Sequence, residues 1–284
     1  MASTPTPDPA GPDTATPDPG TPDPGTPDTW DPQRYLAYAD ERGRPFVELV
    51  ARIGAERPAR VADLGCGPGN LTRLLAERWP AAYVTGVDAS AAMIERAEAD
   101  QQVDHPGIEW QLADAREWQP EAQLDVLVTN ATLQWIPDHL ALLPRLTGML
   151  APGGWFAMQV PGNFAEPSHT LRDEVAALPA FAEHTGTAQR PASHDAVDYL
   201  RALTALGLEA DAWETTYLHV LRGPDAVFEW VRATGARPVL QALPDALRPA
   251  FEEEFKARLR EAYPADEAGR VVLPFRRVFA VGRA

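Results

Sequence analysis

The chain has 284 residues, of which 45% are hydrophobic, and it carries a formal net charge of −16 with a sequence pI of about 4.7. A chain of this length and composition can bury one large core, or a core with a cap. The negative charge argues against nucleic acid and against an anionic membrane surface as partners, because phosphate groups need a basic surface. No apolar run reaches the length of a membrane span.

The sequence contains a single cysteine, so no intrachain disulfide can form and we expect a reduced, cytoplasmic setting. Residues 1–29 are rich in Pro, Asp, Thr and Gly, and they lack the basic start and apolar core of a secretory signal. Such a tract has no apolar surface to bury. We therefore predict a disordered tail without a catalytic role, followed by one folded domain over residues 30–284.

The folded part is predicted to begin with a helix that reaches Ile53 and is followed by the segment Val61–Asn70. This segment reads Val-Ala-Asp-Leu-Gly-Cys-Gly-Pro-Gly-Asn. A short apolar strand is expected to end at Asp63, and a helical pattern begins at Leu71. A glycine turn between a strand and a helix lets a ligand approach the backbone, because a Cβ there would block the ligand or forbid the required φ.

The glycine spacing distinguishes two classes of cofactor. The dinucleotide pattern G-x-G-x-x-G seats a pyrophosphate on the helix N-terminus, whereas this chain has D-x-G-x-G-x-G with a carboxylate at the strand end. A carboxylate repels a phosphate and attracts the ammonium group of an amino acid. The pattern therefore favours S-adenosylmethionine over a nicotinamide cofactor. The candidate cofactor-binding residues are Asp63, Gly65, Cys66 and Gly67, with Cys66 interpreted as a small apolar turn residue rather than a nucleophile.

A second apolar strand, Val84–Asp88, also ends in an acid, 19 residues after Gly69. A carboxylate at this distance can accept two O–H bonds from a ribose. Ala89 follows it as a further candidate. Met93, on the next predicted helix, can pack on an adenine face or simply fill the core.

Two further strands complete the predicted binding edge. A strand from Ile108 to Ala113 leads to Asp114 and Ala115, and a strand from Leu124 ends at Asn130. Asp114 can accept a hydrogen bond from an adenine amino group, or it can be a surface acid or a helix cap. In a doubly wound sheet, ligands bind outside the carboxyl ends of the strands. We therefore predict that Asp63, Asp88, Asp114 and Asn130 converge on one ligand.

The second half of the chain is predicted to complete the sheet and to cover it. The expected elements are a helix after Pro137 with Leu140, Leu143, Leu146 and Leu150 on one side, a strand at 155–160, a lid at about 161–195, a helix at 196–206, strands at 208–220 and 271–281, and a helical cap insertion at about 224–264.

The motifs, in this order, resemble the class I S-adenosylmethionine-dependent methyltransferases. Additional segments resemble the trans-aconitate methyltransferases: Trp30-Asp-Pro, Arg44-Pro, Asn130–Trp135, Glu166–His169 and Thr234–Pro238. The resemblance runs from about Trp30 to the C-terminus. It implies an α/β fold: a doubly wound, Rossmann-like class I methyltransferase sheet, mostly parallel with an antiparallel last strand, and a helical cap over the substrate site. It also implies O-methylation of a carboxylate of trans-aconitate, giving the monomethyl ester and S-adenosylhomocysteine.

Methylation of a carboxylate determines which side chains the site needs. A carboxylate is already ionised at neutral pH and needs no general base, so we expect proximity and orientation rather than a dedicated catalytic residue. Arginine suits the task of holding carboxylates because its planar fork binds them through two hydrogen bonds. The partner is then a small polycarboxylate.

The candidate substrate residues lie in the family-like segments. Arg277 is preferred because strand alternation places it on one face with Phe275 and Phe279, and Arg276 on the other. A surface ion pair is the alternative interpretation of each arginine, and a structural hydrogen bond is the alternative for His169. The substrate-binding candidates are Arg237, Arg277, Tyr217, His169, Trp30 and Tyr35.

Three other functions stay open from the sequence. One is methylation of a neutral small molecule of secondary metabolism, another is a non-catalytic module that binds the cofactor, and the last is a nicotinamide dehydrogenase. The sequence shows no metal-ligand spacing, and a monomer is the default expectation.

Overall fold

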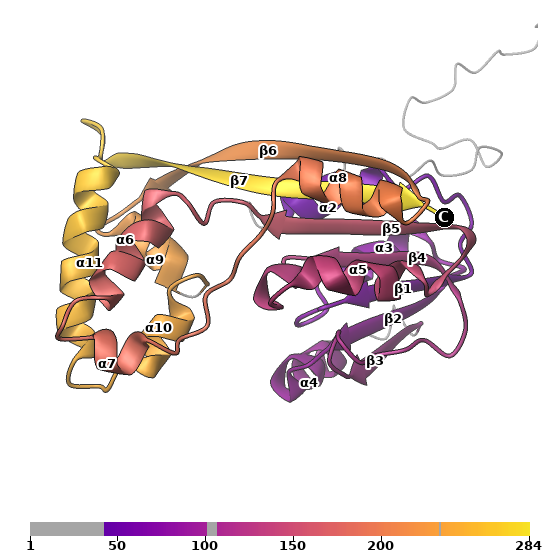
Figure 1. The fold of residues 1–284 in the computed structure, drawn as a ribbon, viewed down its shortest axis with the longest axis horizontal. Coiled ribbons are helices and arrows are strands. Elements are labelled where there is room, and N and C mark those ends of the chain that lie inside the picture. The colour runs from indigo at the N-terminus through magenta and orange to yellow at the C-terminus, as the bar shows by residue number, and fades with distance from the viewer. Residues whose placement is uncertain (1–42, 101–106, 233) are drawn as a thin grey trace, which may run out of the picture. The chain divides into compact units, whose positions relative to one another are not determined.

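The computed structural model describes residues 43–100, 107–232 and 234–284 (Figure 1). The predicted tail at residues 1–29 and the candidate residues Trp30 and Tyr35 lie outside these ranges. The predicted first helix is described only from Arg44, where α2 (Arg44–Ala51) begins.

Within the described residues, seven strands form one sheet in the order β3-β2-β1-β4-β5-β7-β6. The strands are β1 (Arg60–Leu64), β2 (Tyr83–Asp88), β3 (Ile108–Leu112), β4 (Leu124–Asn130), β5 (Leu150–Pro161), β6 (Glu209–Arg222) and β7 (Arg270–Arg283). Strands β1 to β5 pair in parallel, and β7 runs antiparallel to both β5 and β6. The predicted doubly wound sheet with an antiparallel last strand is confirmed.

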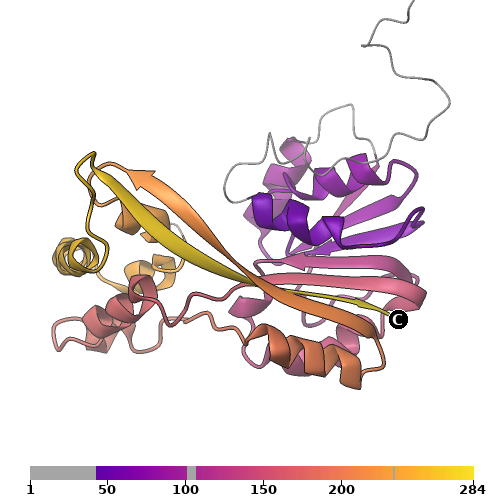
Figure 2. The ribbon, with the colours of Figure 1, turned by 90° about the horizontal axis from the view of Figure 1, so that it is seen from above.

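Helices cover both faces of the sheet, which explains why its central strands read as continuous apolar runs. Helix α2 packs on β5 and β7, whereas α8 lies on the opposite face against β6 and β7 (Figure 2). The helices and 3₁₀ turns of this part are α2, α3 (Thr72–Arg78), α4 (Ala91–Ala99), η1 (Leu133–Trp135), η2 (His139–Leu142), α5 (Leu143–Thr147) and α8 (Ala196–Ala205). The helix predicted to include Leu150 is shorter, because Leu150 is the first residue of β5.

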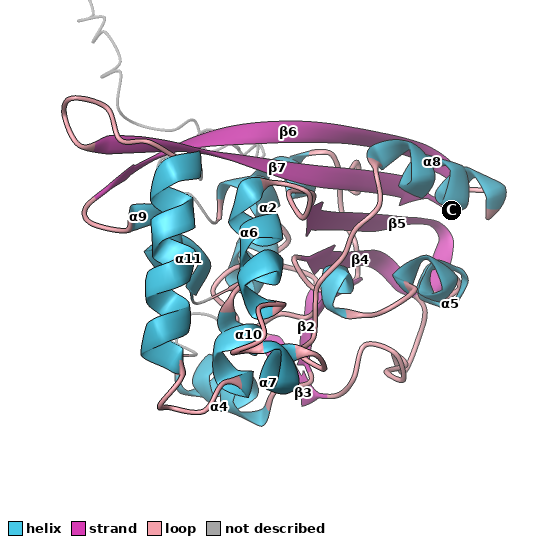
Figure 3. Ribbon diagram, turned by 60° about the vertical axis from the view of Figure 1, so that its left-hand side comes forward, coloured by secondary structure: helices cyan, strands magenta, loops and turns pink. Residues whose placement is uncertain are grey.

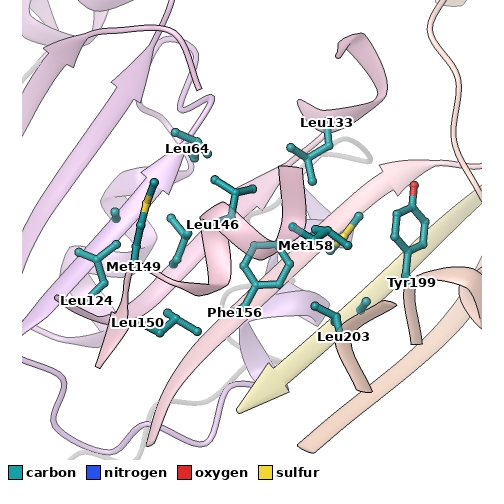
Figure 4. Packing of buried hydrophobic residues seen from close by; sticks show 14 of the residues in the cluster. Leu64, Leu124, Leu133, Leu146, Met149, Leu150, Phe156, Met158, Tyr199 and Leu203 are labelled. Carbon is teal, nitrogen blue, oxygen red and sulfur yellow. The ribbon is translucent and has the colours of Figure 1, made fainter. Parts of the chain in front are cut away.

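A hydrophobic cluster joins the sheet to α5 and α8. Leu146 of α5, Phe156 and Met158 of β5, and Tyr199 and Leu203 of α8 are all fully buried in it (Figure 4). Their spacing along each element matches the period of a helix or a strand, so each element presents one apolar face to this core.

Strands β6 and β7 extend past the end of β5 as a two-stranded ribbon, since β7 pairs with β5 only from Arg277 onward. Five helices pack on this ribbon and on one another, and we call them the helical subdomain (Figure 3). They are α6 (Pro167–Ala176), α7 (Ala182–Thr185), α9 (Ala226–Arg232), α10 (Arg237–Ala242) and α11 (Arg248–Ala262).

The helical subdomain has a core of its own. Phe228, Phe251 and Phe255 from its helices pack with Leu273 and Phe275 of β7. The segments predicted separately as a lid and a cap both contribute to this core, α6 and α7 from the former and α9 to α11 from the latter. They therefore form one structural unit, because neither set of helices buries its apolar face alone.

No helix in the described part of the chain has both the length and the apolar character of a membrane span.

Candidate functional site

The glycine turn after β1 has the backbone conformation that its sequence predicts. Gly65, Gly67 and Gly69 have φ values of +81°, +55° and +77°, a region that L side chains rarely adopt. A Cβ at Gly65 would collide with Thr132, and one at Gly69 would collide with Trp110. A Cβ at Gly67 would meet nothing within 4 Å. Packing therefore requires two of these glycines, and the third leaves the backbone open.

This turn forms one wall of a cavity of about 760 Å³, which we call the strand-end cavity. Its other walls come from the carboxyl ends of β2 and β3, from the segment after β4 and from α10. The predicted cofactor residues that line it are Gly65, Gly67, Asp88, Ala89, Met93, Asp114 and Ala115. These seven residues share one cavity, and their contact with a cofactor stays a prediction.

Asp88, the last residue of β2, connects two walls of the strand-end cavity. Its Oδ2 accepts a hydrogen bond from the backbone N–H of Gly67, and its Oδ1 accepts one from that of Ser90, both at 2.9 Å. A carboxylate has about four acceptor positions. Asp88 thus fixes the glycine turn and can still accept hydrogen bonds from hydroxyl groups of a ligand.

Asp114, just after β3, is held by Arg116. Its Oδ1 accepts from the backbone N–H of Arg116 at 2.8 Å, and its Oδ2 accepts from the Arg116 Nη2 at 2.5 Å. The hydrogen bonds from the Arg116 side chain lower the pKa of Asp114 to about 2. Asp114 is therefore ionised at neutral pH, and much of its capacity to accept hydrogen bonds is already used.

Asp63 and Cys66, both predicted to bind the cofactor, are not among the residues that line the strand-end cavity. Asp63 is 2% exposed, and its Oδ2 accepts a hydrogen bond from the Thr72 hydroxyl at 2.6 Å. Burial raises the pKa of Asp63 to about 6 and also raises that of the Cys66 thiol. Both side chains point into the protein because β1 lies in the centre of the sheet with helices on each face.

A second cavity, of about 350 Å³, lies between the sheet and the helical subdomain, and we call it the subdomain cavity. The ends of β4 and β5 contribute Asn130 and Pro161, and β7 contributes Phe275 and Arg277. Asn130 was predicted to bind the cofactor, but it lines this cavity and not the strand-end cavity. Strand β4 lies between β1 and β5, so the residues at its end are divided between the cavities: Asn130 lines the subdomain cavity, and Ala131 lines both.

Both candidate arginines line the subdomain cavity. Arg277 is 8% exposed, and its guanidinium carbon lies 4.4 Å from the centre of the Phe275 ring. Arg276 faces the other side of β7 and forms ion pairs with Asp195 and Glu214, as strand alternation predicts. The cavity therefore receives the charge of Arg277, while Arg276 has a structural role.

Arg237, the first residue of α10, lines both cavities. Its side chain is exposed, and it forms no ion pair with any residue that the structure describes. Together with Arg277, it gives the subdomain cavity a positive charge in a protein that is otherwise strongly acidic.

His169 of α6 also lines the subdomain cavity and is 4% exposed. Its Nδ1 lies 3.1 Å from the Ser168 hydroxyl oxygen, and its ring meets that of Phe164 edge to face. Burial lowers the pKa of His169 to about 4, so the ring is neutral near pH 7. Across the described ranges, no group of three or more His, Cys, Asp or Glu side chains is placed to hold a metal ion.

Tyr217 does not line the subdomain cavity, although it was predicted to bind the substrate. Its hydroxyl donates a hydrogen bond to Glu48 of α2 at 2.6 Å, and the Arg44 guanidinium lies 5.1 Å from its ring centre. Burial and this hydrogen bond raise the pKa of Tyr217. A buried phenol needs a polar partner, and α2 supplies one here.

The two cavities share part of their walls. Ala131, Trp135 and Arg237 line both of them. Ala131 has a φ of +52°, which is strained for a residue with a Cβ. Because the two cavities share these residues, which we call the shared wall, they lie next to each other. A transfer reaction between two bound molecules requires such adjacent sites.

Sequence reasoning missed two polar residues of the subdomain cavity, Gln134 and Asn163. Asn163 comes just after the carboxyl end of β5, so the strand-end rule that selected Asn130 could have included it. Gln134 lies in η1, and no sequence pattern indicated where that turn would place it.

Comparisons with known proteins agree with this geometry. Residues 61–154 match a family described as a methyltransferase domain. A trans-aconitate 2-methyltransferase from Streptomyces avermitilis is 52% identical over 258 residues, covering 89% of this chain and 96% of that protein. Another with the same name, from Streptomyces coelicolor, is 52% identical over 264 residues, covering 89% and 86%. The solved structure of YcgJ from Bacillus subtilis matches with a TM-score of 0.55 and 14% identity, over 84% of this chain and 97% of that one, which bears on the fold alone.

Proposed function

The chain belongs to the trans-aconitate 2-methyltransferase family, and from this premise we propose that it transfers a methyl group from S-adenosylmethionine to a carboxylate of trans-aconitate. The products are the monomethyl ester and S-adenosylhomocysteine. The observation that carries the proposal is the shared wall between a cavity built on a glycine turn and a cavity that contains two arginines.

The strand-end cavity fits S-adenosylmethionine. Gly67 leaves the backbone open toward the ligand, Asp88 offers acceptors for the ribose hydroxyls, and Met93 offers an apolar surface for adenine. Asp63 supports the glycine turn and does not line the cavity. Its carboxylate accepts a hydrogen bond from the Thr72 hydroxyl and so links the end of β1 to the start of α3. When bound, the cofactor supplies a methyl group whose C–S bond breaks with the electron pair left on sulfur as a carboxylate oxygen forms the new C–O bond.

The subdomain cavity fits a polycarboxylate. Arg237 and Arg277 bind carboxylates, and the neutral His169 contributes a polar edge without adding charge. The reacting carboxylate is ionised at neutral pH, so the chain needs no base at this position. Its contribution is to orient one carboxylate toward the shared wall and to keep water away.

We propose that the helical subdomain, with the segments at about 161–195 and 224–264, acts as the cap over the acceptor. Trp30 and Tyr35 are proposed to add to the acceptor site, and residues 1–29 to form a tail outside one folded domain at 30–284. Removing residues 1–29 should leave kcat unchanged, and a large loss would contradict this division. A monomeric, cytoplasmic enzyme that binds neither nucleic acid nor membrane completes the proposal.

The experiment that tests the function is a mass-spectrometric assay with S-adenosylmethionine and trans-aconitate, run beside cis-aconitate, citrate and a panel of neutral acceptors. A monomethyl ester of trans-aconitate in clear excess supports the proposal. Turnover of a neutral acceptor without turnover of trans-aconitate would overturn the substrate assignment and keep the methyl donor.

A further inference from the structure

The subdomain cavity is lined by side-chain amides that contain buried atoms without a hydrogen-bond partner among the described residues. Asn163 is 1% exposed, and neither its Nδ2 nor its Oδ1 has a partner among the described residues. The same holds for the Oδ1 of Asn130 and the Oε1 of Gln134, both on the same cavity. Leaving a buried polar group unpaired costs about 1–3 kcal/mol, so native folds retain few such atoms and those few require an explanation.

The amides of Asn130 and Asn163, which we call the amide pair, occupy a defined place relative to the two cavities. In the sheet order, the strand-end cavity lies over the ends of β1, β2 and β3, followed by Asn130 at the end of β4. Asn163 follows β5, and Arg277 on β7 comes last. Along the sheet, a ligand in the subdomain cavity therefore meets the uncharged amides at the ends of β4 and β5 and meets the Arg277 charge one strand farther, while Arg237 reaches the shared wall from α10.

The placement of the amides and of Arg277 along the sheet matters for the chemistry of the proposed reaction. A carboxylate loses its negative charge as the new C–O bond forms. A cation paired with that carboxylate would stabilise the reactant more than the transition state and would raise the barrier, because only interactions that strengthen in the transition state accelerate a reaction. An amide N–H can orient the same carboxylate at a smaller electrostatic cost, since the amide carries no net charge.

We propose that side-chain N–H groups of the amide pair, above all the unpaired Nδ2 of Asn163, hold the reacting carboxylate of the acceptor where β4 and β5 end, while Arg237 and Arg277 bind its other carboxylates. This assignment rests on the proposed function. Asn130 and Asn163 then contact the acceptor and orient its reacting carboxylate. The two arginines recognise the charge of the carboxylates that do not react. The acceptor class is a small molecule with at least two carboxylates, one of which is bound without a cation.

The first test compares Asn163→Leu with Arg277→Leu in steady-state kinetics with trans-aconitate. Leucine has a similar size and no hydrogen-bonding group, so Asn163→Leu should lower kcat about 10- to 100-fold and change the acceptor KM by less than about 3-fold. Arg277→Leu should show the opposite split, with most of its effect on KM. Gln123→Leu is the control, because Gln123 is exposed at the start of β4, away from both cavities.

The second test uses Asn163→Asp, which keeps the shape of the side chain and adds a negative charge at neutral pH. Activity should fall further than in Asn163→Leu, and it should recover relative to wild type as the pH drops and the introduced carboxyl becomes protonated. A purely structural role for Asn163 would make the thermal stability of Asn163→Asp recover together with its activity, whereas contact with the acceptor changes activity at a pH where the variant is fully folded. Calorimetric titration with S-adenosylmethionine and thermal unfolding report whether each variant folds, and Asn130→Leu replaces any Asn163 variant that does not.

The outcomes distinguish this inference from the proposed function. If the wild-type chain methylates no carboxylate, both fail. If it methylates trans-aconitate and both Asn163→Leu and Asn130→Leu retain kcat, the amide pair is excluded and the proposed function stands. A loss that appears only in the acceptor KM of these variants would also overturn the inference, since it would make the amides part of general binding.

Discussion

The strand-end cavity and the subdomain cavity are built from different kinds of structure. The strand-end cavity depends on the backbone, with Gly67 left open and Asp88 tying the turn to β2. The subdomain cavity depends on side chains that are far apart in the sequence, such as Asn130, His169 and Arg277. Short local motifs specify the former, whereas the latter exists only when the ribbon and the five helices of the subdomain have assembled.

This difference implies that the two binding functions can be altered separately. Substitutions at the ends of β1 and β2 should change cofactor affinity and leave the acceptor alone. Substitutions on β7 or α6 should do the reverse. Only the shared wall should affect both, and the experiments below test that separation from the largest expected effect to the smallest.

Arg277→Leu should have the largest effect. Removing a buried charge that pairs with a bound carboxylate costs about 2–5 kcal/mol, so kcat/KM for trans-aconitate should fall about 30- to 5,000-fold. The dissociation constant for S-adenosylmethionine, measured by calorimetry, should change by less than about 2-fold, because the sites are separate. Arg232→Leu on α9 is the matched control. Equal losses of kcat/KM in Arg277→Leu and Arg232→Leu would contradict the assignment of Arg277 to the acceptor site.

The two regions should also respond to pH in opposite directions, through His169 and Asp63. Burial lowers the pKa of His169 from 6.5 to about 4 and raises that of Asp63 from 3.8 to about 6. Between pH 6.5 and 4, only the unfolded state binds a proton at His169, so its contribution to stability is lost as the pH falls. Between pH 3.8 and 6, the folded state holds the proton at Asp63, so its contribution is lost as the pH rises. Each effect amounts to about 3 kcal/mol.

Two variants separate these opposing contributions in denaturant unfolding from pH 4 to pH 7. The free energy of unfolding of Asp63→Asn should increase relative to that of wild type as the pH rises, because only wild type loses the Asp63 contribution. The free energy of unfolding of His169→Gln should increase relative to that of wild type as the pH falls, because only wild type loses the His169 contribution. Slopes of the same sign in both variants would contradict the pKa shifts that burial produces in the two regions.

Asp88→Ala should weaken binding of S-adenosylmethionine by about 1–3 kcal/mol, the cost of lost hydrogen bonds to a charged group. It should also loosen the glycine turn, since Asp88 accepts the Gly67 N–H. Calorimetric titration measures the affinity, with Glu95→Ala on the exposed side of α4 as the control. The acceptor KM at saturating cofactor should stay constant, and unchanged cofactor affinity would remove Asp88 from the site.

The sequence predicted the sheet and the wall of the strand-end cavity because both follow from local rules. Strand ends, a glycine turn and an acid at a set distance located Gly67, Asp88 and Asp114 without any tertiary information. The same pattern could not show that the Asp63 side chain is buried and accepts the Thr72 hydroxyl, so its contact with the cofactor stays a prediction.

The subdomain cavity was predictable only in part. Alternation along β7 separated Arg277 from Arg276, which is again a local rule. Tyr217 on β6 was predicted to bind the substrate, yet its hydroxyl donates to Glu48, a partner 169 residues away that no local pattern identifies. Gln134 and Asn163 were missed because their roles depend on which polar atoms the assembled fold leaves unpaired, and that property belongs to the tertiary structure.

Ala131→Gly tests the shared wall and should have the smallest effect. Relief of the strained φ of +52° is worth about 1 kcal/mol, partly offset by the greater entropy of glycine in the unfolded chain. The melting temperature should therefore rise by about 1–2 °C. Asp138→Gly, at the same φ but on neither cavity wall, should match this gain without a kinetic effect. Ala131→Gly should lower kcat a few-fold, because a less rigid shared wall aligns the two ligands less well. An unchanged kcat would mean that the side chain of Ala131 has no part in aligning them.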